Sequence, residues 1–150
     1  MNSVGRIVFM GFMPVLLLSS FKIEKTIPIT WETLTDVTFK TRLNLQSKEY
    51  IKIPDFGPSV KSLEGKRVEI RGYMIPVSIP DHKYVISAQP MTSCFFCGSA
   101  GPESVIELNF QQTPKRFKTD EIRTLSGVLE LNANDPESLC YRLNLVELVK

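Results

Sequence analysis

Histidine, tryptophan and cysteine are scarce in this sequence, which has one His, one Trp and three Cys among its 150 residues. A single histidine, His82, and no convincing pair of carboxylates leave general acid–base catalysis without evident participants. The formal net charge of +2 gives no field that would favour nucleic acid or an anionic membrane as a partner. We therefore expect a non-enzymatic binding or accessory module whose partner is a small ligand or a protein.

The sequence also lacks an apolar run of the roughly 20 residues that are needed to cross a bilayer. Near the N-terminus, residues 7–18 are apolar, and they lie between Arg6 on one side and Ser19 and Ser20 on the other. A basic start, a short apolar core and small residues at the end are typical of a secretory signal peptide. We predict a signal peptide over residues 1–20, an exported protein that is periplasmic or extracellular, and no stable membrane span after cleavage.

Residues 21–64 show little regular patterning, and we expect them to form an N-terminal extension that packs on the main domain. A short helix is predicted from Trp31, with Thr30 as its N-cap. Thr33 stands where a full capping box needs Glu or Gln. Residues 50–66, YIKIPDFGPSVKSLEGK, are predicted to form a strand fragment and a turn that wrap over the main domain.

Over residues 65–150 apolar and polar residues alternate, which is the pattern of β-strands. The residues expected to point inward are Val68, Ile70, Gly72, Met74, Ile106, Leu108, Phe110, Leu129, Leu131, Tyr141, Leu143 and Leu145. A glycine inside the first strand permits the sharp bend that lets one strand serve both halves of a barrel. We therefore predict a mainly β protein with a small five-stranded OB-like barrel and an N-terminal extension that contains a short helix. Residues 111–124 are polar and could hold another short helix. An irregular antiparallel sandwich is the alternative.

Two segments carry a resemblance to a known family: LEGKRVEIRGYMIPV, residues 63–77, and SVIELNF, residues 104–110, with a loop containing cysteine and proline between them. Over about residues 50–149 the chain resembles a family of exported bacterial proteins of unknown function that have an OB-like core. In that family the loop cysteine is followed by a histidine and a proline-rich run, whereas this chain has Cys97 and neither feature. The resemblance therefore implies a fold and a compartment but no reaction.

The loop CFFCGSAGPES holds Cys94 and Cys97 in a C-x2-C motif that is followed by Gly98. Two thiolates at this spacing can bind one metal ion, because the chain between them folds into a tight turn. Gly98 would let backbone N–H groups point at sulfur. Cys140 and His82 are the residues that could complete a Cys3His zinc site.

Oxidation is the rival interpretation, since thiols of exported proteins tend to pair. A Cys94–Cys97 disulfide would contribute only about 2 kcal/mol, and pairing either residue with Cys140 about 4 kcal/mol, because the second loop is longer. A thiol–disulfide redox protein that uses Cys94 and Cys97 is the alternative function. Its usual βαβ setting is missing, and Phe95 and Phe96 favour a partly buried turn. Metal binding, a structural disulfide, redox exchange and unpaired thiols all stay open.

Cys140 is expected on the polar face of the last strand, together with Arg142 and Asn144. In a simple barrel, the turns after the first and fourth strands would place His82 and Cys140 at one end. The loop with the other cysteines would then begin at the opposite end, and only its length would let it fold back.

Two further segments are candidate contact surfaces. The candidate loop for a ligand or partner consists of Gly98, Gly101, Pro102 and Glu103. In residues 113–121, basic side chains around Phe117 would suit single-stranded nucleic acid on an OB barrel. Export and the adjacent Asp120 and Glu121 oppose that interpretation, so we expect a solvated connection.

Intact mass and metal content, measured on one mature sample purified without chelator, distinguish the interpretations of the cysteines. A loss of two hydrogens without metal is expected for a structural disulfide. One zinc per chain, with three free thiols after denaturation, is expected for a metal site. Three thiols with neither change would contradict both.

Overall fold

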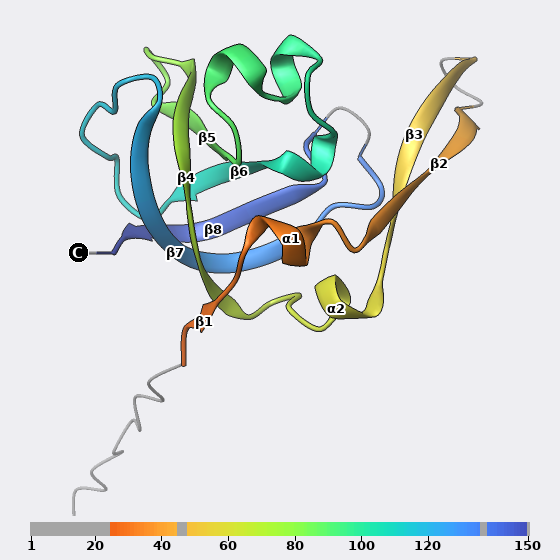
Figure 1. Ribbon diagram of the computed structural model, residues 1–150, viewed down its shortest axis with the longest axis horizontal. Coiled ribbons are helices and arrows are strands. Elements are labelled where there is room, and N and C mark those ends of the chain that lie inside the picture. The colour runs from red at the N-terminus through yellow and green to blue at the C-terminus, as the bar shows by residue number, and fades with distance from the viewer. Residues whose placement is uncertain (1–24, 45–47, 136–137, 150) are drawn as a thin grey trace, which may run out of the picture.

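The computed structural model describes residues 25–44, 48–135 and 138–149, so the predicted signal peptide lies outside the described residues. A closed five-stranded barrel forms its body (Figure 1). In order around the barrel the strands are β4 (Arg67–Ser78), β5 (Lys83–Ser87), β6 (Val105–Phe110), β8 (Tyr141–Leu148) and β7 (Glu121–Leu131), and β7 pairs back with β4. A short additional strand, β1 (Ile27–Pro28), lies parallel to β4. The predicted OB-like, mainly β fold is confirmed. No helix in this part of the chain has the length and apolar character to span a membrane.

Strand β4 joins the two sides of the barrel, because its first part pairs with β7 and its second part with β5. Gly72 lies just before the residues of β4 that pair with both neighbours. A Cβ at this position would lie 2.5 Å from the carbonyl oxygen of Ser87 and 3.0 Å from Cζ2 of Trp31. Glycine is therefore needed for the close approach of β5 and the indole ring.

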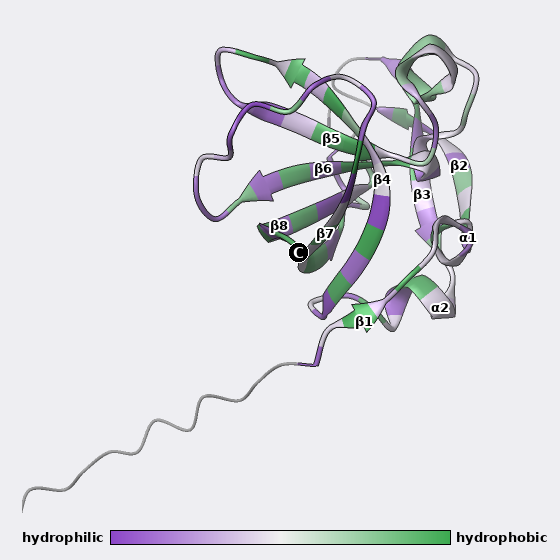
Figure 2. Ribbon diagram, turned by 60° about the vertical axis from the view of Figure 1, so that its left-hand side comes forward, coloured by the Kyte–Doolittle hydropathy of each residue, from purple (hydrophilic) through white to green (hydrophobic). Residues whose placement is uncertain are grey.

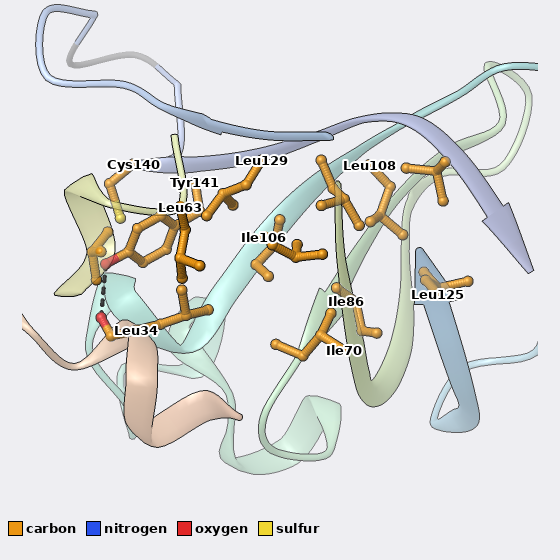
Figure 3. Close-up of a cluster of buried hydrophobic side chains, with 14 of the residues drawn as sticks. Leu34, Leu63, Ile70, Ile86, Ile106, Leu108, Leu125, Leu129, Cys140 and Tyr141 are labelled. Atoms are coloured by element: carbon orange, nitrogen blue, oxygen red, sulfur yellow. Dashed lines mark hydrogen bonds between the residues drawn. The ribbon is translucent and has the colours of Figure 1, made fainter. Parts of the chain in front are cut away.

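The barrel interior is filled by the residues that alternation predicts, and Figure 3 shows part of this core. Leu145 is the exception, since its side chain is 49% exposed and Val146 is buried instead. Leu145 and Val146 together lie opposite Gly127, which makes a β-bulge, and Leu145 has a φ of +52°. The extra residue reverses the alternation, so the prediction that Leu145 points inward is wrong.

The connection between β6 and β7 contains no helix, so the short helix that residues 111–124 could have held does not form. Residues 111–120 are irregular and are anchored by Phe117. Its ring stacks on Phe110 with centroids 5.9 Å apart and meets Tyr84 edge-on at 5.2 Å. The connection is therefore attached to the barrel by an aromatic cluster rather than fully solvated, and this aromatic ring is not presented to a nucleic-acid base.

The N-terminal part contains the predicted short helix α1 (Trp31–Leu34), a second one, α2 (Pro58–Lys61), and a hairpin of β2 (Val37–Asn44) and β3 (Glu49–Phe56). Thr33 Oγ1 accepts a hydrogen bond of 3.4 Å from the Thr30 N–H, so threonine fills the role that a capping box gives to Glu or Gln. The sequence pattern predicted only a strand fragment at β3 and no strand at β2. Figure 1 shows this hairpin extending away from the barrel.

One buried hydrogen bond attaches α1 to the barrel. The Tyr141 hydroxyl at the start of β8 donates to the Leu34 carbonyl oxygen over 2.7 Å (Figure 3). Phe56, the last residue of β3, packs on the same ring with centroids 5.6 Å apart. Trp31 adds a second link, because its indole N–H donates to the Arg71 carbonyl oxygen over 2.8 Å. These contacts fix the base of the hairpin against the barrel.

We expect Tyr141→Phe to lower the free energy of unfolding by about 1–2 kcal/mol, because it leaves the buried Leu34 carbonyl without its donor. Urea unfolding followed by far-UV circular dichroism measures this change. Tyr50→Phe is the matched control, since Tyr50 is 77% exposed and its loss of a hydroxyl should change the stability little. Equal stabilities of the two variants would contradict the role of the Tyr141 hydroxyl.

Candidate functional site

The loop between β5 and β6 folds into three short 3-10 turns, η1 (Met91–Ser93), η2 (Phe95–Cys97) and η3 (Pro102–Ser104). Cys94 is buried in a small apolar cluster, whereas Cys97 is exposed. Both thiols donate to the Met91 carbonyl oxygen, over 3.1 and 2.8 Å respectively. The C-x2-C motif therefore forms the expected tight turn, with both sulfur atoms directed at one acceptor.

Gly98 ends η2 with a φ of +74°, a conformation that favours glycine. Its N–H donates to the Phe95 carbonyl oxygen over 2.9 Å, and the Cys97 N–H donates to the Cys94 carbonyl oxygen over 3.1 Å. The expectation that these N–H groups point at sulfur is therefore wrong, because they close the turn instead.

Cys140 is in a different place from the one predicted. It is buried in the main core, and its thiol donates to the Pro102 carbonyl oxygen over 3.4 Å. The predicted polar-face position fails because β8 begins only at Tyr141, one residue later. The predicted separation from the cysteine loop fails because the end of that loop, η3, folds back beside Cys140.

Cys94 and Cys97 lie together at the Met91 carbonyl oxygen, Cys140 lies apart from them at Pro102, and no disulfide joins the three. Over the described residues, no group of three or more His, Cys, Asp or Glu side chains is placed to hold a metal ion. His82 lies in the turn after β4, where its N–H donates to the Ile79 carbonyl oxygen over 3.3 Å. The described residues therefore do not bring His82, Cys140 and the Cys94–Cys97 pair together, and zinc binding stays a prediction.

Two of the thiols have a raised pKa. Desolvation is the main cause for Cys97, and the neighbouring Cys94 raises its pKa further. Desolvation raises the pKa of Cys140 to about 12, and the Glu103 carboxylate adds to the shift. Since the thiolate is the nucleophile in thiol–disulfide exchange, these environments disfavour a redox role at neutral pH.

A cleft of about 460 Å³ lies between the β2–β3 hairpin, the cysteine loop and the connection from β7 to β8. Its apolar walls include Phe39, Pro54, Phe95, Pro102, Leu139 and Cys140. Of the predicted site residues, Pro102 and Cys140 line this cleft. Cys94, Cys97, Gly98, Gly101 and Glu103 do not. The structure thus brings part of the predicted loop to a site whose opposite wall is the hairpin.

Asn132 shapes one side of the cleft, although it was not among the predicted site residues. Its side-chain oxygen accepts from the Asn134 and Asp135 N–H groups over 3.2 and 2.9 Å. Its side-chain nitrogen donates to the Leu139 carbonyl oxygen over 3.2 Å, and its backbone N–H donates to the Cys140 carbonyl oxygen over 2.9 Å. An Asn that precedes such a turn is a recognisable sequence signal, because Asn side chains bond the backbone two residues onward.

Outside the barrel, Arg142 lies between Glu107 and Glu130, with N–O distances of 3.3 and 3.0 Å. The Asn144 side chain also donates to Glu130, over 2.6 Å. Both carboxylates are therefore engaged in a polar cluster across β6, β8 and β7. This arrangement suits a stabilising surface network better than an acid–base pair.

Comparison with known proteins supports the fold. No family model matches the chain, and no curated protein matches it. Among solved structures, the crystal structure of a DUF3299 family protein from Pseudomonas aeruginosa is similar, with a TM-score of 0.52 and 14% identity over 84% of this chain and 97% of that chain. At this identity the likeness shows the fold alone. The neighbour comes from a bacterial family of unknown function, as the sequence resemblance had implied for this chain.

We expect Cys97 and Cys140 to be alkylated by iodoacetamide more slowly in the folded protein than in the unfolded chain at about pH 7.5. A raised pKa leaves a smaller thiolate fraction at that pH, and the rate should increase as the pH rises towards each pKa. Peptide mass spectrometry after timed alkylation measures each site, and the urea-unfolded chain is the control. Faster reaction of Cys97 in the folded protein would instead indicate an activated thiol.

Proposed function

We propose that this protein is an exported, non-enzymatic binding module whose site is the cleft between the hairpin and the barrel. The observation that carries this proposal is the cleft itself, in which three separate parts of the chain meet around a largely apolar space. Concave sites with apolar walls and a few polar groups are the usual form of a binding pocket. On the fold-level likeness, we also place the chain with the DUF3299 type of bacterial protein.

The outer part of the hairpin supports a binding role. Leu43 and Tyr50 lie directly opposite each other on the two strands, and both side chains are exposed. They lie on the same face of the hairpin as Phe39 and Pro54, which line the cleft, because side chains two residues apart share a face. Thr41 and Lys52 lie between these two apolar pairs on the same face, so a ligand that reaches from the cleft to Leu43 and Tyr50 would also cover two polar side chains.

The cysteine loop has a structural role in this proposal. Burial of Cys94 and the raised pKa of Cys97 suit a turn that holds Phe95 against the cleft. After export, oxidation of the Cys94–Cys97 pair to a disulfide, or zinc binding by the pair, would stabilise the turn. The shared Met91 acceptor keeps the two thiols close, and this is the observation that favours redox exchange as the second candidate function.

We expect the cleft to bind the apolar anion 8-anilinonaphthalene-1-sulfonate, and Phe95→Asp to weaken that binding about tenfold or more. Fluorescence titration of the dye measures the affinity. The wall residue Phe95 is replaced by a charge of the same sign as the sulfonate, so both apolar contact and electrostatics are lost.

Phe96→Asp is the matched control, because Phe96 is adjacent and exposed but does not line the cleft. Circular dichroism checks that both variants are folded. Equal dye binding by the two variants, or no enhancement with the native protein, would contradict the cleft as the binding site.

A further inference from the structure

The edge of strand β3 borders the cleft. Four consecutive residues of this strand, 51–54, line it. Successive side chains of a strand point to opposite faces, so one face could supply only alternate residues. Four consecutive lining residues therefore mean that the cleft runs along the strand edge, where backbone groups are accessible.

The pairing of the hairpin shows which backbone groups point to that edge. The Gly57 N–H donates to the Asp36 carbonyl oxygen over 2.7 Å, in line with the register that pairs Val37 with Phe56. In an antiparallel pair, hydrogen-bonded and non-hydrogen-bonded residue pairs alternate. The backbone groups of residues 51, 53 and 55 therefore face β2, and those of residues 50, 52 and 54 face outward.

Pro54 fits this assignment, because proline has no N–H and is tolerated where the N–H would point away from the partner strand. The outward donors are thus the N–H groups of Tyr50 and Lys52, and the outward acceptors are the carbonyl oxygens of Tyr50, Lys52 and Pro54. None of these groups has a hydrogen-bond partner among the described residues outside the hairpin. A row of backbone donors and acceptors without partners at a strand edge is what an additional strand pairs with.

The charges beside this edge indicate the chemistry of the added strand. Lys52 lines the cleft and has no carboxylate partner within the part of the chain that the structure describes. On the opposite wall, Asp135 accepts from the Ser138 hydroxyl over 2.6 Å and lies 3.9 Å from Arg142. The charge in the cleft that a ligand would neutralise is therefore the ammonium group of Lys52, and a carboxylate on the ligand would be complementary to it.

We propose that the cleft binds an extended segment of another polypeptide, which adds as a strand to β3, places apolar side chains against Phe39 and Phe95, and sets a carboxylate near Lys52. This inference rests on the proposed function, since it specifies the occupant of the same cleft. Two outward N–H groups followed by a proline limit the pairing to a short segment. The backbone bonds supply affinity for any extended chain, and the apolar walls and the lysine supply selectivity.

The test begins with a phage-displayed library of random dodecapeptides selected on the full chain, followed by fluorescence anisotropy with each selected peptide. Lys52→Pro removes the outward N–H and the side chain, and Lys52→Ala removes the side chain alone. Because Pro54 already occupies the equivalent outward position, Lys52→Pro leaves the bonds of the hairpin intact. We expect Lys52→Ala to bind about threefold more weakly than the native protein. Lys52→Pro should bind about tenfold more weakly than Lys52→Ala, since a peptide carbonyl loses its donor.

Amide hydrogen exchange gives an independent readout that does not need a variant. Saturating peptide should slow exchange at Tyr50 and Lys52, and should leave Thr41 and Leu43 unchanged, because their N–H groups point to the outer edge of β2. Protection at Thr41 and Leu43 instead would overturn the assignment of the edge.

The outcomes separate this inference from the proposed function. Peptides whose binding is lost in Phe95→Asp, but which bind Lys52→Pro and Lys52→Ala equally and leave Lys52 unprotected, would overturn strand addition and leave the cleft as the binding site. Selected peptides that bind Phe95→Asp and native protein equally, or a selection without any binding peptide, would overturn peptide binding in the cleft. The dye titration would then decide whether the cleft binds other ligands.

Discussion

The hydrogen bond from the Tyr141 hydroxyl to the Leu34 carbonyl oxygen is the contact on which the rest of the arrangement depends. It joins the first residue of β8, which belongs to the closed barrel, to the last residue of α1, which precedes the hairpin. Phe56, where the second strand of the hairpin ends beside the start of the first, packs on the same tyrosine ring. One buried side chain thus fixes both strands at the base of the hairpin, and the cleft has a second wall only because the hairpin is held there.

The sequence was sufficient to predict the barrel, because its interior positions obey the alternation that a half-buried strand requires. Val68, Ile70 and Met74 in β4 show this plainly. The alternation failed at Leu145, where a bulge inserts one residue, and no local pattern distinguishes a bulged residue from a regular one. The polar composition of residues 111–124 suggested a helix, but the aromatic contacts of Phe117 decided the path of the chain.

The candidate site was predictable only in part. Pro102 was predicted from its place in the cysteine loop and Cys140 from its thiol. Their proximity was not, since it depends on how a long loop folds back over the barrel. The hairpin wall was missed for a different reason. Strand β2 reads TFKTRL over much of its length and carries few apolar residues, because most of it has no core to face. A strand that forms the wall of a cleft shows a weaker alternation of apolar and polar residues than a strand whose side chains fill a barrel.

Trp31 gives this protein a built-in optical reporter. It is the only tryptophan of the chain, and its indole lies against Gly72 and donates to the Arg71 carbonyl oxygen. Figure 2 shows the barrel strands with alternating hydrophobic and hydrophilic residues, and it shows α1 outside the barrel. The emission spectrum of the indole therefore responds to detachment of the N-terminal part, whereas far-UV ellipticity is dominated by the barrel. Any difference between the two signals during denaturation would measure how strongly the wall of the cleft is coupled to the barrel that supports it.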